Sequence, residues 1–168
     1  MNLQSLIVPE LPVHAGLVEK VHTHVFGPGA HARAAFRLRE QGPHDLNVSF
    51  VAVNDGDLIG SVRMTPIVCN EGHRGFLLGP LAVSPSWQNV GLGKALVARA
   101  VSAAEADGVA RFVLLVGDAP YYAPLGFDVC APGHLSLPGP VNPRRLLVHP
   151  LGDFDAANIK GRIKHAKR

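Results

Sequence analysis

The sequence predicts a mixed α/β (α+β) fold: one domain built around a central mixed sheet of six to seven strands, antiparallel in its N-terminal half. Three observations predict this class. The chain has 168 residues, 47% of them hydrophobic, which suits a single domain with a substantial core. Apolar runs alternate with turn signals between residues 47 and 83, as in consecutive antiparallel strands. A glycine-bearing turn then leads into an Ala-rich helical run beginning near Gly91, followed by another strand, and this order implies a parallel crossover.

The first third of the chain is predicted to form a short strand and two helices. Leu6–Val8 is an apolar run that ends at the proline-flanked segment 9–12. Residues 13–25 carry apolar side chains at helical spacing, which indicates an amphipathic helix. The breakers at 27–29 separate this helix from a segment of helix formers at 31–40.

The middle of the chain is predicted to form three consecutive antiparallel strands. The apolar runs Asn47–Val53 and Leu58–Pro66 flank the sequence Asn-Asp-Gly-Asp at 54–57, which is a strong hairpin signal. A second turn at 71–75 leads into Phe76–Val83. Because each connection is short, the three strands are expected to pair in order.

The second half supplies the crossover and a last strand. The helix from Gly91 is expected to end at Gly108, a C-terminal cap. Phe112–Val116 is a continuous apolar run, typical of a strand covered on both faces. Residues 131–143 are rich in proline and glycine and are expected to be a loop, and Arg144–Leu151 the last strand. The core-facing positions expected on the helix are Leu92, Leu96, Val97, Ala100, Val101 and Ala104.

The positive charge of the chain is confined to its end. Residues 152–168 hold five Lys and Arg side chains against two Asp, which accounts for the whole formal charge of +3. A nucleic-acid module usually spreads basic and aromatic side chains over a folded face, and this segment has one aromatic, Phe154. We therefore expect residues 1–151 to form the domain, residues 152–168 a flexible basic tail, and no nucleic-acid partner.

The turn at 88–94, Gln-Asn-Val-Gly-Leu-Gly-Lys, carries the chemistry. The first amides of a helix lack intrahelical partners, and the helix dipole adds positive charge there, so a glycine turn before a helix favours a phosphate. The mononucleotide pattern fails, because Gln88 stands where its first glycine belongs and Ala95 replaces its hydroxyl. The dinucleotide pattern fails because Leu96 occupies its last small position.

A third pattern fits without a mismatch. Leu81–Pro85, two further residues and then Gln88-x-x-Gly91-x-Gly93 resemble the acyl-CoA loop of the GNAT superfamily of N-acetyltransferases. A second run, Tyr121–Phe127, resembles the [FY]-Y-x-x-L-G-F element near the C-terminus of the same superfamily. The two motifs stand in the order and at the separation found in that superfamily, across roughly residues 47 to 130. The expected fold is therefore a GNAT-like domain.

The resemblance implies an activity and a set of site residues. It implies an N-acetyltransferase that uses acetyl-CoA as co-substrate and a primary amine, on a small molecule or a peptide, as acceptor. The pantetheine arm is expected along the strand edge, the diphosphate on the turn, and Gln88 ordering that turn or touching phosphate. The residues expected to bind the co-substrate are Leu81, Ala82, Val83, Gln88, Asn89, Val90, Gly91, Leu92, Gly93 and Lys94.

Tyr122 is the expected catalytic residue, because it lies four residues before Gly126, where the superfamily has its general acid. A phenol with a pKa of about 10 keeps its proton at neutral pH and can protonate a departing thiolate. Tyr121 is expected to pack as a buried aromatic. No base is assigned, because the strand at 112–116 carries no carboxylate. The titratable residues near expected loop edges are interpreted as solvated or capping residues rather than bases: Glu71, His73, Asp118 and His134. The asparagine that many relatives carry ahead of the tyrosine is also absent, a departure that concerns the second side of the CoA site.

Other classes of function find less support. The nine histidines and two cysteines follow no metal-ligand spacing, so no metal is expected. No apolar run is long enough to cross a membrane and the N-terminus lacks the features of a signal peptide, which together indicate a cytoplasmic protein. A homodimer stays open, as does the alternative of a non-catalytic, regulatory acyl-CoA-binding domain.

Overall fold

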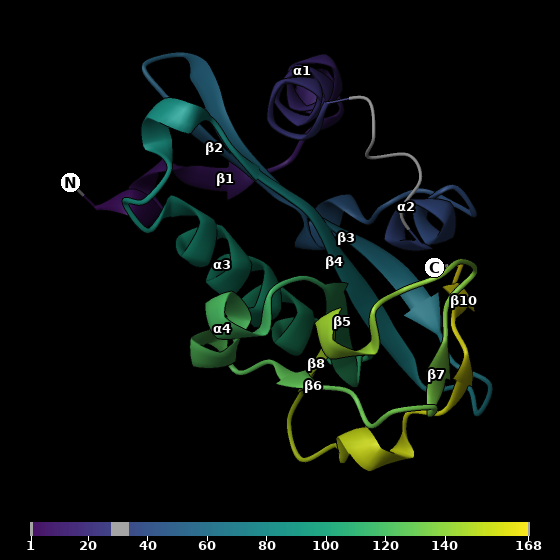
Figure 1. The fold of residues 1–168 in the computed structure, drawn as a ribbon. Coiled ribbons are helices and arrows are strands. Elements are labelled where there is room, and N and C mark those ends of the chain that lie inside the picture. The colour runs from purple at the N-terminus through teal and green to yellow at the C-terminus, as the bar shows by residue number, and fades with distance from the viewer. Residues whose placement is uncertain (1, 28–33, 168) are drawn as a thin grey trace.

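The computed structural model describes residues 2–27 and 34–167, which form one mixed sheet with helices on both faces (Figure 1). The strand order is β1-β2-β3-β4-β5-β8-β6, and β10 pairs with β3 beside this path. The short strands β7 and β9 form a separate parallel pair. The strands are β1 (Ile7–Pro9), β2 (Phe50–Asn54), β3 (Asp57–Val68), β4 (Arg74–Val83), β5 (Phe112–Val116), β6 (Asp128–Val129), β7 (Leu135–Ser136), β8 (Leu146–Pro150), β9 (Gly161–Arg162) and β10 (Lys164–His165).

The antiparallel half of the sheet follows the predicted order. The β2–β3 hairpin turns at Asp55 and Gly56, whose φ angles of 49° and 83° are both positive, as in a type I′ turn. The β3–β4 pair extends from Gly60 and Val83 to Val68 and Arg74. The fold class predicted from the sequence is confirmed.

The parallel crossover runs from β4 through α3 (Leu92–Asp107) to β5. In the described chain, β4 and β5 pair at three positions, from Gly75 with Phe112 to Leu77 with Leu114. Strand β4 continues to Val83, where β3 is its only strand partner among the described residues. The sheet therefore opens between β4 and β5 on the side where α3 begins.

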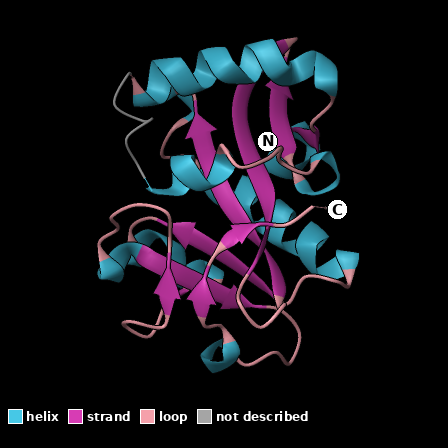
Figure 2. Ribbon diagram, turned by 90° about the vertical axis from the view of Figure 1, so that its right-hand side faces the viewer, coloured by secondary structure: helices cyan, strands magenta, loops and turns pink. Residues whose placement is uncertain are grey.

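The helices divide over the two faces of the sheet. Helix α3 covers one face, whereas α1 (Ala15–Phe26) and α2 (Ala34–Arg39) lie on the other (Figures 1 and 2). A short helix, α4 (Ala119–Tyr122), follows β5. The core under α3 includes Phe76, Phe127 and five residues of the helix itself: Leu92, Leu96, Val97, Ala100 and Ala104. Burial of apolar area at about 25 cal/mol per Å² is the main force holding α3 to the sheet.

The segment predicted as a helix at 31–40 is shorter in the described part of the chain. Helix α2 occupies Ala34–Arg39, and residues 31–33 lie outside the described residues. The strand predicted from Asn47 begins at Phe50, because Leu46–Val48 form a 3₁₀ turn capped by the Asp45 carboxylate. None of the helices in the described residues is long and apolar enough to cross a membrane.

The end of the chain differs from the flexible tail that its charge predicts. Within residues 152–167, Ile159 and Ile163 are buried in a second hydrophobic core, which also contains Phe112. Strand β10 pairs with the end of β3, and the His165 backbone N–H donates to Gln41 Oε1 at 3.1 Å. The His165 ring covers Gly42, where a Cβ would lie 2.5 Å from it. Apolar residues spaced among the basic ones anchor this segment, a pattern that the net charge conceals.

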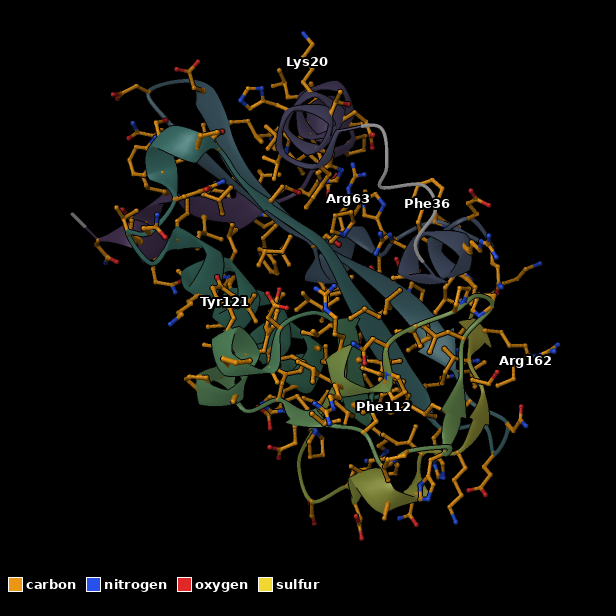
Figure 3. All side chains as sticks on the ribbon, in the orientation of Figure 1. Lys20, Phe36, Arg63, Phe112, Tyr121 and Arg162 are labelled. Carbon is orange, nitrogen blue, oxygen red and sulfur yellow. The ribbon has the colours of Figure 1, made fainter. Side chains whose placement is uncertain are left out.

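A buried ion-pair network joins α1 to the sheet. Glu10, with 2% of its surface exposed, accepts hydrogen bonds from Arg63 at 2.8 Å and lies 3.2 Å from His44 Nε2. Arg63 extends between β3 and α1 and also donates to Glu19 at 3.0 Å (Figure 3). Burial alone raises the pKa of the Glu10 carboxyl, but its hydrogen bonds and the charges of Arg63 and His44 outweigh burial and lower the pKa to about 2.

The low pKa of Glu10 makes the fold sensitive to acid. The stabilisation by this carboxylate is complete above its ordinary pKa of 4.5 and is lost as the pH falls toward 2. Because removing one member of a buried pair leaves the other charge unpaired, Glu10→Gln is expected to lower the free energy of unfolding by about 3 kcal/mol at pH 7. The difference from wild type should shrink at pH 3. Urea unfolding at both pH values measures it, with the exposed Glu105→Gln as matched control; equal losses at the two pH values contradict the linkage.

Candidate active site

The turn between β4 and α3 is held in a conformation that exposes the start of the helix. The side-chain amide of Gln88 donates to the Val83 carbonyl at 3.0 Å and ties the turn to β4. Asn89 and Gly91 have φ angles of 65° and 90°. Gly91 is the N-cap of α3 in the left-handed conformation, and no side chain caps the helix there. No side-chain cap in the described chain therefore competes for the opening amides of α3, as the predicted anion site requires.

The second half of β4 forms the wall beside this turn. Leu81, Ala82 and Val83 pair with β3 on one edge only. Their other edge faces the opening in the sheet, where the described chain provides no strand partner. An extended ligand with amide groups can add to such an edge as a peptide does in β-augmentation.

A cavity of about 530 Å³ occupies the opening in the sheet. Its walls come from α1, α2, the second half of β4, the end of β5, α4 and the segment before β8. Both tyrosines of the chain line it. The cavity combines an apolar floor with charged groups at the rim, among them Glu19, Arg39, Asp118 and Arg145.

Tyr122 is held in this cavity by packing of its ring. The ring makes edge-on contacts with Phe127 at 5.8 Å and Tyr121 at 4.8 Å between centroids. Gly117 leaves room for it, because a Cβ there would lie 2.6 Å from the Tyr122 ring. Burial, together with the neighbouring Tyr121 and the Asp118 carboxylate, raises the pKa of Tyr122 to about 12. The phenol is therefore a neutral proton donor at physiological pH.

Tyr121 differs from its predicted role as a buried aromatic. Its side chain is 37% exposed, and a Cβ on Gly93 would lie 2.5 Å from its hydroxyl. The Lys94 ammonium lies 5.5 Å from the centroid of the Tyr121 ring. Tyr121 thus connects the cavity to the first turn of α3, a connection that no motif in the sequence indicates.

The four titratable residues near loop edges are not brought together in the cavity. Asp118 lies at the cavity rim and pairs with Arg145 at 3.4 Å. In the turn between β3 and β4, His73 Nε2 lies 3.5 Å from Glu71 Oε2. His134 lies before β7 and does not line the cavity.

His22 is a cavity residue that the sequence does not reveal. Its Nε2 atom is buried and makes no hydrogen bond within the described chain. Burial first, and then the charges of Arg63 and Arg39, lower the pKa of His22 to about 4, so the ring is neutral at pH 7. A lone histidine on an amphipathic helix carries no spacing signal, which is why sequence reasoning overlooks it. Among residues 2–27 and 34–167, no group of three His, Cys, Asp or Glu side chains could hold a metal ion.

Comparison with known proteins decides the family. A family model described as Acetyltransferase (GNAT) family matches residues 17–127, which include the turn, most of the cavity lining and both tyrosines. The chain belongs to the GNAT family of acetyltransferases. The resemblance inferred from the two motifs is therefore confirmed, and the protein is an acyltransferase of the N-acetyltransferase type.

Relatives of this GNAT acetyltransferase match it over nearly their whole length. The N-acetyltransferase YhbS of Escherichia coli K12 is 30% identical over 162 residues, 95% of each chain. The crystal structure of E. coli YhbS in complex with CoA superposes with a TM-score of 0.80 at 28% identity, covering 96% of this chain and 89% of that one. A GNAT family acetyltransferase from Brucella melitensis, solved with acetyl-CoA, shares the fold with a TM-score of 0.71 at 24% identity, over 95% and 94% of the two chains.

The two tyrosines of this acetyltransferase should titrate separately. The raised pKa of Tyr122 predicts an ionisation near pH 12 rather than near 10. Because the chain has only these two tyrosines, the ultraviolet absorbance of tyrosinate can assign each step. Tyr122→Phe should remove the higher step and Tyr121→Phe should leave it, with circular dichroism confirming that each variant is folded. Two wild-type steps near pH 10 contradict the packing described for Tyr122.

Proposed function

We propose that the protein transfers an acetyl group from acetyl-CoA to a primary amine, on a small molecule or a peptide, by direct attack. The observation that carries this proposal is the opening of the sheet between β4 and β5, with an uncapped helix start at one end and a neutral, buried phenol in its cavity. The complex of E. coli YhbS with CoA, at 28% identity, supports the co-substrate.

The residues around the opening suit the parts of acetyl-CoA. The amides of residues 89–94 bind the diphosphate, since the left-handed Gly91 and the lack of a side-chain cap leave this helix end available to an anion. Gln88 acts indirectly, because its side chain orders the turn by bonding Val83. The free edge at Leu81–Val83 pairs with the amides of the pantetheine arm, and the thioester reaches the cavity beside Tyr122.

Transfer then proceeds in two bond changes. The neutral amine attacks the thioester carbonyl and forms the new C–N bond, and a main-chain amide of β4 stabilises the developing oxyanion. As the C–S bond breaks, Tyr122 gives its proton to the sulfur and regains one from water, while the former amine loses its extra proton to solvent. Burial that raises the pKa of the Tyr122 phenol also disfavours a thiolate in the same cavity, which favours proton transfer to the departing sulfur.

Tyr122→Phe removes the proton donor and keeps the ring that packs on Phe127. Turnover should fall about 100-fold or more, because general acid catalysis contributes that much, while the Kd for CoA stays within about twofold. Thiol release in a panel of amines measures turnover, and calorimetry measures CoA binding. Unchanged turnover in the variant removes Tyr122 from the mechanism.

The same assays separate the enzyme from a binding domain. Wild-type protein should release thiol from acetyl-CoA with at least one class of primary amine among amino acids, polyamines, aminoglycosides and peptide N-termini. Binding of CoA without thiol release from any of them favours a regulatory acyl-CoA-binding domain. Absence of CoA binding at millimolar concentration contradicts both.

A further inference from the structure

The hydroxyl of Tyr121 is not needed for the contact between the two tyrosine rings. The ring contributes the edge-on contact with Tyr122, 4.8 Å between centroids, and a phenylalanine ring could make the same contact. The hydroxyl instead extends to the first turn of α3, where Gly93 is the second residue of the helix. In the described part of the chain, this hydroxyl makes no hydrogen bond.

Three kinds of hydrogen-bond donor lie near the first turn of α3: a phenol, an ammonium group and backbone amides. The Tyr121 hydroxyl approaches Gly93 so closely that a Cβ there would lie 2.5 Å from it, with the next nearest atom 3.7 Å away. The Lys94 ammonium lies over the Tyr121 ring at 5.5 Å from its centroid. The opening amides of α3, a helix of 16 residues, have no side-chain cap. Figure 3 labels Tyr121 where α4 lies beside α3.

Tyr121 is also part of the cavity lining, whereas the residues of the turn at 88–94 are not. The side chain thus stands where the cavity meets the turn, which is where the inner arm of a CoA thioester has to join its diphosphate. A phenol at this junction is 37% exposed and accessible to a ligand.

We propose that the Tyr121 hydroxyl is a specific ligand of the CoA diphosphate, acting with Lys94 and the opening amides of α3. A neutral phenol donating to a phosphate oxygen forms a charge-assisted hydrogen bond, the stronger class of such bonds. The inference rests on the proposed function and adds to it a binding residue that neither motif indicates. It also gives Gly93 a second role, because any side chain there displaces the hydroxyl.

The test compares two thioesters in two proteins. Acetyl-CoA carries the diphosphate, whereas acetyl-pantetheine ends before it. For acetyl-CoA, Tyr121→Phe should lower kcat/KM and weaken CoA binding about tenfold, the effect of losing one hydrogen bond to a charged group. For acetyl-pantetheine, measured at enzyme concentrations that quantify the wild-type rate, kcat/KM should be the same in both proteins.

Two results overturn the proposal. Unchanged CoA binding in Tyr121→Phe means that the hydroxyl does not bind the diphosphate. An equal loss for both thioesters means that Tyr121 acts only through the position of Tyr122. Either result leaves the proposed acetyl transfer intact, because that function fails only if wild-type protein releases no thiol from acetyl-CoA with any of the amines.

A double-mutant cycle supplies an independent check with Gly93. Gly93→Ala alone should weaken CoA binding, because the new Cβ displaces the Tyr121 hydroxyl. In the Tyr121→Phe background the same substitution should cost less than about twofold, since the atom nearest to the Cβ has gone. Additive losses in the double variant contradict the proposed contact, and the thermal midpoint of each variant confirms folding.

Discussion

The parting of β4 from β5 after three residue pairs is the constraint on which the rest of the site depends. Beyond Leu77 and Leu114 the two strands separate, and β4 keeps one free edge up to Val83. The cavity fills the space between them, and α3 begins at its outer end. The strand edge, the uncapped start of α3 and the phenol of Tyr122 all border this opening, which is what the proposed function requires.

The helices on the two faces of the sheet are held by different interactions. Under α3 the core is apolar, and this helix is held by burial of leucine, valine and alanine side chains. Under α1 the contact with the sheet includes Glu10, Arg63 and Glu19, a network that fixes where α1 lies. Because α1 also supplies His22 to the cavity, the ion pairs help set the shape of the cavity wall that α1 forms.

The sequence predicts the elements whose signal is local. Asn-Asp-Gly-Asp at 54–57 specifies its turn through residues that accept positive φ, and the core positions of α3 follow its helical period. The turn at 88–94 and Tyr122 are recognisable because the two family motifs consist of particular residues at fixed spacing. Contacts between distant segments have no such signal. Tyr121 meets Gly93 only because β5 and α4 bring them together, and Ile159 and Ile163 are concealed by the charges around them.

Strand β10 has a consequence for how the chain matures. Residues 164 and 165 pair with β3 and, through His165, hold Gln41 and cover Gly42 just after α2. A protein emerges from the ribosome with its N-terminus first, so α2 emerges well before β10. Helix α2, although encoded in the first quarter of the sequence, therefore acquires this support only once β10 has been synthesised as well. The cavity wall that α2 contributes is complete only after β10 has emerged.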